Sequence, residues 1–365
     1  MDAKTRQVGM AQLTLDPREQ AVLELIARKV SRVLVTGGGG FLGQAICTRL
    51  RAAGIGVVSI ARNRYPALDD MGVTQIQASL TDMPALLRAC EGCQLVFHVA
   101  ARAGVWGAAQ SYLDANVDGT ANVIAACQRQ GIASLVYTST PSVTFDGRDE
   151  EGIDETAPYA RRFLNAYGRS KSLAERMLLA SQGVQVADNQ RLNVVALRPH
   201  LIWGPGDPHL VPRVLERGRR GRLRLVGRTD KLVDTTYIDN AAWAHLLAAK
   251  TLLISPQKAA GKAYFLANDE PITMAQMLNR ILACEALPPV EKRLSRQLAF
   301  ALGAVLEWGY GLFGIAAEPP MTRFVARQLS CSHFYDLTAI KRDLEYVPLV
   351  NIDEGMIQLK NWLKK

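Results

Sequence analysis

Two residues that can exchange a proton, Tyr167 and Lys171, lie four positions apart in the segment YGRSK. On a helix this spacing places both side chains on one face, where they point toward the same ligand. A free tyrosine has a pKa near ~10, and a neighbouring ammonium group favours the phenolate and brings that pKa toward neutrality. The pair therefore suits proton exchange with a ketone, although the same spacing occurs by chance on many exposed helices.

A glycine-rich segment upstream, Thr36–Gly43 (TGGGGFLG), supplies a second signal. It lies between an expected strand and an expected helix, which is the context that a dinucleotide-binding turn requires. Gly37 permits the tight turn, Gly40 lets backbone N–H groups approach a pyrophosphate, and Gly43 allows close packing of helix on sheet. The cofactor-binding residues expected here are Gly37, Gly40, Phe41, Leu42 and Gly43.

The residues after the second expected strand indicate which dinucleotide binds. A site for NAD usually places a carboxylate there, on the ribose hydroxyls, but the segment Ser59–Arg64 (SIARNR) contains none. Arg62 and Arg64 can instead hold a 2′-phosphate by charge-assisted hydrogen bonds. We therefore expect NADP(H), with Arg62 better placed than Arg64; the alternative is that one or both arginines are solvated loop charges.

Short apolar, β-branched runs alternate with longer segments of helical spacing, which predicts βαβ units and a parallel sheet. The fold class is α/β, a Rossmann-type doubly wound parallel sheet with a smaller, mostly C-terminal substrate-binding domain. We expect strands at Val33–Val35, Val57–Ile60, Leu95–Val99, Leu135–Thr138 and Val194–Leu197. We expect helices at Asp16–Lys29, Phe41–Ala53, Pro84–Cys90, Ala108–Gln128 and Asn165–Ser181, and the rhythm resumes at Tyr237–Lys250 and Ala263–Ala267.

Changes of pattern divide the chain. Residues 1–30 form an N-terminal helical extension that lacks the apolar region of a signal peptide. Residues 31–206, with 236–266 returning to them, form the NADP-binding Rossmann domain. Residues 207–235 and 267–365 form the substrate-binding region.

The composition excludes several classes of protein. With 365 residues, 48% hydrophobic and 21% charged, the chain is not disordered, collagen-like or a coiled-coil rod. A net charge of +9 favours anionic ligands, but no module typical of nucleic-acid binding supports a nucleic-acid partner. Six cysteines are sparse for this length, which fits a reduced, cytoplasmic compartment. Cys90 and Cys93 form a C-x-x-C without a second pair at zinc spacing, so we expect no metal site.

Together these motifs resemble the extended branch of the short-chain dehydrogenase/reductase superfamily. The resemblance covers most of the chain after Ser31. Besides the two motifs above, it rests on His98–Ala101 (HVAA), Asn116–Asn122 (NVDGTAN), Tyr137–Thr140 (YTST) and Leu197–Asp207 (LRPHLIWGPGD).

The resemblance implies roles for further residues. Thr140, with Ser139 and Ser142 as neighbouring hydroxyls, is expected to hydrogen-bond the reacting oxygen. Asn116 is expected to have a structural, water-holding part in the catalytic set. Leu80, Ala100 and Pro199 are expected to contact the cofactor, with Ser79 standing where relatives usually carry an aspartate that faces adenine. His98 ends a buried strand, and we expect it to be a hydrogen-bonded core residue.

Four other stretches resemble the 3β-hydroxysteroid and sterol-4-carboxylate dehydrogenase-like group: Thr138–Gly147, Ile202–Pro208, Asp234–His245 and Pro319–Phe324. Their combination is similar to bacterial reductases of long-chain olefin biosynthesis, which implies NADPH-dependent reduction of a 2-alkyl-3-oxoalkanoic acid to a 2-alkyl-3-hydroxyalkanoic acid. The resemblance further implies a homodimer and an assembly with a β-lactone synthetase and a decarboxylase of α/β-hydrolase fold. A 3β-hydroxysteroid or sterol-4-carboxylate dehydrogenase, a sugar-nucleotide epimerase and a non-catalytic NADP-binding sensor remain as alternatives.

Two features bear on a long-chain substrate. Leu298–Ala317 is about twenty residues long with one charge, and we expect a buried helix that lines an apolar cavity; peripheral membrane contact and a membrane span are the alternatives. Its candidate wall residues are Phe300, Leu302, Trp308 and Phe313. An arginine cluster is expected either to bind the substrate carboxylate or to form a solvated basic face; it comprises Arg213, Arg217, Arg219, Arg220 and Arg222.

Overall fold

The computed structural model describes residues 15–186 and 190–365. The large sheet contains β1 (Arg32–Thr36), β2 (Gly56–Ala61), β3 (Thr74–Gln77), β4 (Leu95–His98), β5 (Ser134–Thr138), β7 (Asn193–Pro199) and β12 (Lys262–Leu266). Their order is β12-β7-β5-β4-β1-β2-β3, and all neighbours run parallel. The expected doubly wound parallel sheet is confirmed.

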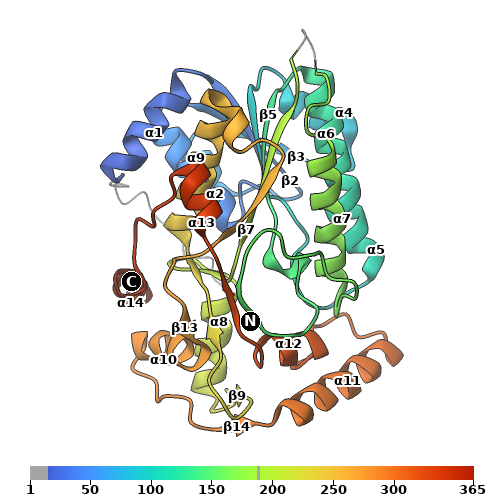
Figure 1. Ribbon diagram of the computed structural model, residues 1–365, viewed down its shortest axis with the longest axis vertical. Coiled ribbons are helices and arrows are strands. Elements are labelled where there is room, and N and C mark those ends of the chain that lie inside the picture. The colour runs from blue at the N-terminus through green and yellow to red at the C-terminus, as the bar shows by residue number, and fades with distance from the viewer. Residues whose placement is uncertain (1–14, 187–189) are drawn as a thin grey trace.

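Helices cover both faces of this sheet (Figure 1). One layer contains α1 (Pro17–Ala27), α2 (Phe41–Ala52) and α9 (Ile238–Ile254); the other contains α4 (Met83–Cys90), α6 (Gly119–Gln130) and α7 (Ala166–Ala180). Successive side chains of β1 point to opposite faces of the sheet. Val33 and Val35 pack in the apolar core on one face, and Leu34 packs in the core on the other face. Burial on both faces explains why the strands read as continuous apolar runs.

Capping residues set the helix starts. Asp16 accepts the backbone N–H of Arg18 and forms a capping box with Glu19, so α1 begins at Pro17. Asn165 accepts the N–H of Gly168 at 2.9 Å, which starts α7 one residue before Tyr167. The part of the N-terminal extension before residue 15 lies outside the described residues.

The helix expected at Ala108–Gln128 is interrupted. α5 (Ala109–Tyr112) is followed by a π-helical turn, Leu113–Asp118, before α6 continues. The widened turn contains Asn116, whose side-chain amide pairs with the backbone of a neighbouring loop. Turns of this kind are often found at functional sites.

Shorter elements complete the chain. A four-stranded sheet has the order β13-β10-β15-β6, with β6 (Glu150–Ile153), β10 (Leu232–Val233), β13 (Ile272–Thr273) and β15 (His333–Tyr335). Two strand pairs join β8 (Ile202–Trp203) with β11 (Thr236–Tyr237), and β9 (Leu225–Val226) with β14 (Arg293–Leu294). The remaining helices are α3 (Pro66–Asp70), α8 (Leu210–Arg219), α10 (Met274–Cys284), α11 (Arg296–Leu312), α12 (Arg323–Gln328), α13 (Thr338–Leu344) and α14 (Ile352–Leu363). Of these, α8, α10, α11 and α12 gather at one end of the molecule (Figure 1).

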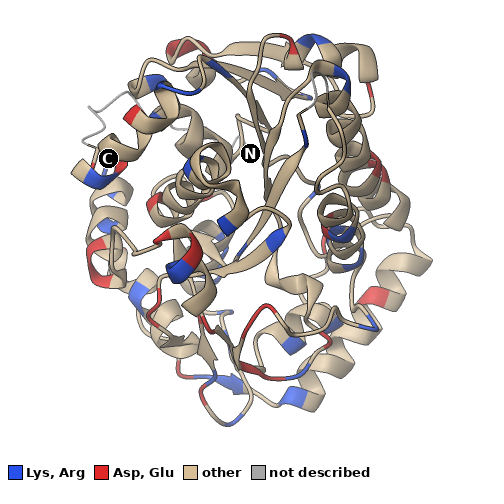
Figure 2. Cartoon of the chain, turned by 45° about the horizontal axis from the view of Figure 1, so that its top comes forward, with Lys and Arg blue, Asp and Glu red and all other residues tan. Residues whose placement is uncertain are grey.

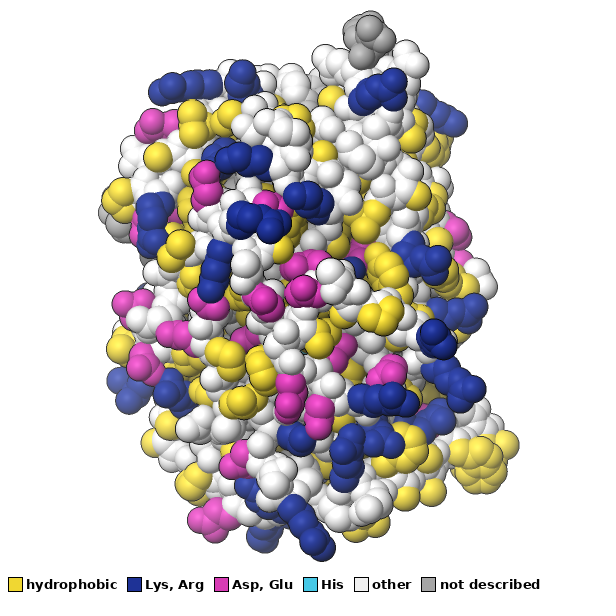
Figure 3. Space-filling model, in the orientation of Figure 1, with side chains coloured by type: hydrophobic (Ala, Val, Ile, Leu, Met, Phe, Trp, Pro, Cys, Tyr) yellow, Lys and Arg dark blue, Asp and Glu magenta, His cyan; other side chains and the backbone are white. Residues whose placement is uncertain are grey.

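The expectation for Leu298–Ala317 is wrong. α11 lies on the surface, where it buries only the small residues Ala299 and Gly303 against α12. Its large apolar side chains face outward, with Trp308 70% and Phe313 76% exposed, and the apolar surface is visible at the lower right of Figure 3. Across residues 15–186 and 190–365, no helix combines the length and apolar character needed to cross a membrane.

Candidate active site

A cavity of about 780 Å³ opens at the carboxyl ends of the central strands. β1 and β4 meet there, at the point where strand order reverses, which is where doubly wound sheets bind ligands. The cavity extends from the glycine-rich turn to the proton-transfer residues. The predicted site residues that line it are Gly37, Gly40, Phe41, Leu42, Gly43, Arg62, Leu80, Ala100, Thr140, Tyr167, Lys171 and Pro199.

The glycine-rich turn has the geometry of a phosphate cradle. Gly37 has φ +69°, and a Cβ there would lie 2.9 Å from Cα of Ala100. A Cβ on Gly43 would lie 2.2 Å from the carbonyl oxygen of Gly37, so only glycine lets α2 approach this closely. The first turn of α2 contains no acidic residue, so its N-terminus favours an anion. These features fit the pyrophosphate of a dinucleotide.

The two candidate 2′-phosphate arginines differ in position. Arg62 is exposed and lines the cavity beside Ser79 and Leu80. Arg64 lies outside the cavity lining and forms a bidentate pair with Asp69, with N···O distances of 3.0 and 2.9 Å. The structure therefore brings Arg62 to the cofactor cavity and does not bring Arg64 there.

Lys171 lines the cavity and makes two close contacts with the end of β5. Its side chain is buried, its Nζ donates to the carbonyl oxygen of Thr138 at 2.6 Å, and the ammonium lies 4.1 Å from the centroid of the Tyr137 ring. Burial lowers the pKa of Lys171 to about 7, and the carboxylate of Glu175 opposes this shift. Glu175 also forms a buried ion pair with Arg198, with an N···O distance of 2.6 Å.

Tyr167 and Thr140 are the two hydroxyl-bearing residues of the proton-transfer site. Both line the cavity. Burial raises the pKa of Tyr167 to about 12, and a hydrogen bond with Thr140 lowers it. We expected Lys171 to lower this pKa, but in the structure Thr140 is the group that does so. The phenol is therefore protonated at neutral pH, as a proton donor must be.

Asn116 lies behind the cavity and does not line it. Its Oδ1 accepts the backbone N–H of Arg102 at 2.7 Å, and its Nδ2 donates to the Arg102 carbonyl at 3.1 Å and to Ser170 Oγ at 2.9 Å. It joins the loop after β4 to α7, which is a positioning role.

Two further expectations concern buried polar residues. His98 contacts Thr36 Oγ1 at 2.8 Å and Thr120 Oγ1 at 2.9 Å, and burial lowers its pKa to about 3, so it is a neutral core residue as expected. All six cysteines are buried and unpaired. In the described part of the chain, no group of metal-ligating side chains is found.

The arginine cluster does not reach the cavity. Arg213 pairs with Glu318 and Arg219 with Glu285, both at exposed positions. Arg220 pairs with Glu216, and Arg217 donates to the Pro320 carbonyl. Figure 2 shows Lys and Arg dispersed among acidic residues over the molecule. The solvated basic face, and not the carboxylate site, is the interpretation that fits.

Three cavity residues escaped the sequence analysis. The Tyr65 ring fills the space above Gly39, where a Cβ would lie 2.1 Å from it. Asp207 accepts three backbone N–H groups at the start of α8. Arg102 follows the HVAA segment directly, and its place after a central parallel strand is the signal that could have found it.

Comparison with known proteins identifies the family. The model of the 3-beta hydroxysteroid dehydrogenase/isomerase family matches residues 34–293. The chain belongs to this family. It is therefore an oxidoreductase, of the extended short-chain dehydrogenase/reductase type.

Two curated relatives and one solved structure are similar to most of the chain. The chain is 59% identical to a 2-alkyl-3-oxoalkanoate reductase of Shewanella oneidensis, over 98% of this chain and 94% of the relative. It is 50% identical to a protein of the same name in Stenotrophomonas maltophilia, over 90% and 98%. An epimerase structure from Methanothermobacter thermautotrophicus superposes with a TM-score of 0.74 over 96% of both chains, but at 18% identity this likeness concerns the fold alone.

Proposed function

We propose that the chain reduces 2-alkyl-3-oxoalkanoic acids to 2-alkyl-3-hydroxyalkanoic acids with NADPH, in olefin or hydrocarbon biosynthesis. The observation that carries the proposal is the 59% identity to a 2-alkyl-3-oxoalkanoate reductase over 98% of the chain. It is supported by a cavity that joins a dinucleotide cradle to a tyrosine, a threonine and a lysine.

Each of these residues has a defined part in the proposed reaction. A bound nicotinamide cofactor supplies the hydride. Tyr167 donates its phenolic proton to the oxygen of the C3 carbonyl as that oxygen becomes an alkoxide. Thr140 hydrogen-bonds the same oxygen and stabilises its developing charge. Lys171 binds the cofactor ribose. Its hydrogen bond to the Thr138 carbonyl also ties α7 to the end of β5.

The cofactor contacts are proposed residue by residue. Gly37, Gly40 and Gly43 form the pyrophosphate cradle together with Phe41 and Leu42. Arg62 receives the 2′-phosphate and Leu80 lies at adenine. Ala100, which is packed against Gly37, contacts the cofactor beside the glycine-rich turn, and Pro199 lies toward the nicotinamide. Arg64 is left out of this set because it is paired with Asp69.

The first experiment is oxidation of racemic 2-alkyl-3-hydroxyalkanoic acids by purified protein. NADP⁺ and NAD⁺ are compared, a 3β-hydroxysteroid panel is run in parallel, and the reduced cofactor is followed by absorbance. Activity on the long-chain acid with NADP⁺ supports the proposal. Activity on steroids with NAD⁺, and none on the acids, overturns both the substrate and the cofactor.

The alternatives make different predictions. A steroid or sterol-carboxylate dehydrogenase is compatible with the family, and the same panel tests it. A sugar-nucleotide epimerase retains NAD, so release of NAD on denaturation would identify it. A non-catalytic sensor is disfavoured because both Tyr167 and Lys171 are present at the cavity.

The division of labour along the chain is part of the proposal. Residues 31–206 and 236–266 bind the cofactor, residues 207–235 and 267–365 bind the substrate, and residues 1–30 are an extension. A cytoplasmic location is supported by the six unpaired buried thiols.

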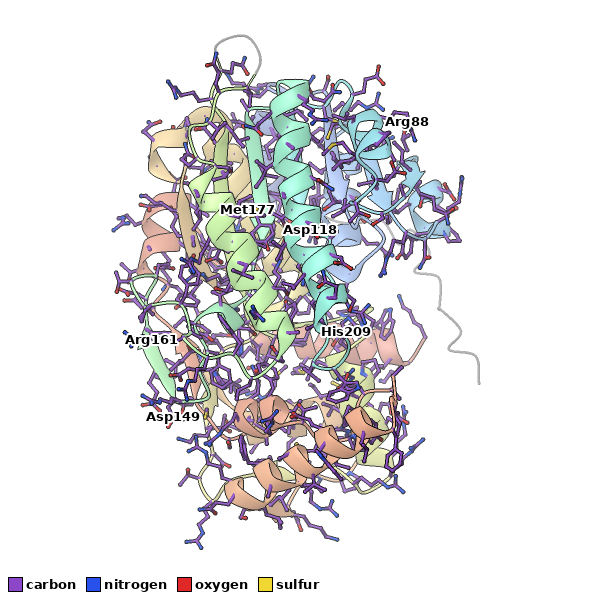
Figure 4. The ribbon with its side chains drawn as sticks, turned by 90° about the vertical axis from the view of Figure 1, so that its right-hand side faces the viewer. Arg88, Asp118, Asp149, Arg161, Met177 and His209 are labelled. Atoms are coloured by element: carbon purple, nitrogen blue, oxygen red, sulfur yellow. The ribbon has the colours of Figure 1, made fainter. Side chains whose placement is uncertain are left out.

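We also propose a homodimer through α6 and α7, which lie side by side as an outer layer in Figure 4. Light scattering at several protein concentrations tests the homodimer.

The exposed face of α11 supports a peripheral contact. It presents Leu298, Leu302, Val305, Trp308 and Leu312 to solvent, which is typical of helices that rest on a lipid surface. Loss of vesicle co-sedimentation in Trp308→Ser tests membrane contact. Loss of co-purification with the β-lactone synthetase and the α/β-hydrolase-fold decarboxylase, in the same variant, tests whether this face instead serves the proposed assembly.

A further inference from the structure

Arg102 is a basic residue of the cavity lining that has no anionic partner among the described residues. The residue lines the cavity, and its Nε is buried and has no hydrogen-bond partner. Among residues 15–186 and 190–365 it forms no ion pair. A guanidinium group has five N–H donors in a planar fork that matches a carboxylate.

The surrounding contacts fix this side chain. Asn116 binds both the N–H and the carbonyl of Arg102, as described above. The guanidinium carbon lies 5.1 Å from the centroid of the Tyr112 ring, and the Tyr112 hydroxyl donates to the Trp106 carbonyl at 2.9 Å. Because backbone and side chain are both held, little conformational entropy is lost when an anion binds.

The position is close to the reacting group. Asn116 also bonds Ser170, which lies on α7 between Tyr167 and Lys171. The Tyr112 phenol, which packs against Arg102, is near enough to Tyr167 to raise its pKa. In a 3-oxo acid the carboxyl carbon is two bonds from the carbonyl carbon that accepts hydride. A cation that recognises this carboxylate must therefore lie at the Tyr167 end of the same cavity.

The other basic side chains of the cavity are engaged or placed elsewhere. Besides Arg102, the lining contains Arg62, Lys171 and His209. Arg62 follows β2, at the expected adenine side, and Lys171 is bonded to Thr138. His209 is exposed and follows the Asp207 turn; Figure 4 shows it beside the lower end of the helix layer.

We infer that Arg102 binds the carboxylate of the substrate and selects a 3-oxo or 3-hydroxy acid over the corresponding uncharged ketone or alcohol. This inference rests on the proposed function and deepens it, because it names the residue that distinguishes an acid from a steroid or a simple ketone. It replaces the surface arginines as the carboxylate site.

The test compares two substrates on four proteins. The substrates are a 2-alkyl-3-hydroxyalkanoic acid and the secondary alcohol of the same chain lengths without the carboxyl group. The proteins are wild type, Arg102→Gln, Arg102→Lys and the control Arg161→Gln, which changes an exposed arginine outside the cavity lining. Cofactor KM is measured for each, and thermal unfolding verifies that each variant is folded.

Arg102→Gln is expected to lower kcat/KM for the acid about 10- to 100-fold, the effect of losing a charge-assisted hydrogen bond, while activity on the alcohol stays within about twofold. Arg102→Lys is expected to restore part of the loss, and Arg161→Gln to match wild type. Equal losses on acid and alcohol, or a rise confined to cofactor KM, would show that Arg102 serves the cofactor and would overturn the inference. Wild type that prefers the acid, with Arg102→Gln unchanged, would overturn the inference and leave the proposed function intact. Wild type inactive on the acid would overturn both.

Discussion

The ammonium group of Lys171 lies 2.6 Å from the carbonyl oxygen of Thr138. This bond joins α7 to the end of β5, the strand that leads to Thr140. The proton donor on the helix and the hydroxyl after the strand are thereby held at a fixed separation. Lys171 therefore positions Tyr167 relative to Thr140, in addition to the cofactor contact that we propose for it.

Replacing Tyr167 by Phe should separate chemistry from binding. The ring that packs in the cavity remains, but the proton donor is lost, so turnover should fall by about 10²- to 10⁴-fold, the usual contribution of general acid catalysis. Cofactor affinity should stay within about twofold, measured by quenching of protein fluorescence. Lys171→Met serves as the contrast, because it should weaken both turnover and cofactor binding. Unchanged turnover in Tyr167→Phe would refute its role.

Replacing Thr140 by Val should shift the pH dependence. Oxidation of the alcohol requires the Tyr167 phenolate, and burial holds the pKa of Tyr167 at about 12 although Thr140 lowers it. The oxidation rate should therefore rise with pH throughout the accessible alkaline range, whereas the rate of reduction, which requires the protonated phenol, should not. In Thr140→Val the Tyr167 pKa rises further, so the oxidation limb moves to higher pH. A limb that stays in place in kcat/KM profiles would contradict the hydrogen bond.

Arg62 and Arg64 offer a matched pair for cofactor choice. Arg62→Gln should raise KM for NADP⁺ by about 10-fold or more and leave KM for NAD⁺ nearly unchanged, because only NADP⁺ carries the 2′-phosphate. Arg64→Gln should leave the preference unaltered, since Arg64 is already paired with Asp69. If Arg64→Gln alone changed the preference, the assignment of the 2′-phosphate to Arg62 would be wrong.

The pattern of neighbouring residues was enough to predict the parallel sheet, the glycine-rich turn and the Tyr167–Lys171 pair. Buried parallel strands are apolar throughout, and a glycine turn or a Tyr–Lys pair is confined to a few residues, so both can be read from the sequence. The side on which α11 packs cannot be read in this way. Ala299 and Gly303 face the neighbouring helix because they are small, whereas the larger residues that dominate the hydrophobicity point outward.

Arg102 shows a second limit. Apart from its place after the HVAA segment, the residues around Arg102 do not distinguish it from the arginines of α8, which form the more conspicuous cluster. What distinguishes it is the pairing of its backbone with Asn116, 14 residues along the chain. The exposed arginines Arg213 and Arg219 form ion pairs with Glu318 and Glu285, which are distant from them in the sequence.

A buried carboxyl group outside the cavity should control stability. Asp234 is 1% exposed, its Oδ1 has no hydrogen-bond partner, and its Oδ2 accepts the N–H of Tyr335 at 2.9 Å. Burial raises the pKa of Asp234 to about 7, whereas the unfolded chain has the ordinary value near ~3.9. Between these values the unfolded state releases a proton that the folded state keeps, so this residue lowers the free energy of unfolding as pH rises.

Asp234→Asn retains an acceptor for Tyr335 and removes the ionisation. The melting temperature of the variant relative to wild type should therefore increase from about pH 5 to about pH 8, by about 1 to 2 °C for each kcal/mol of the linkage that is realised. Asp70→Asn, which changes an exposed carboxylate on α3, is the control and should show a small difference that does not vary with pH. A melting-temperature difference for Asp234→Asn that is equal at both pH values would mean that the Asp234 carboxyl group keeps an ordinary pKa in the folded protein.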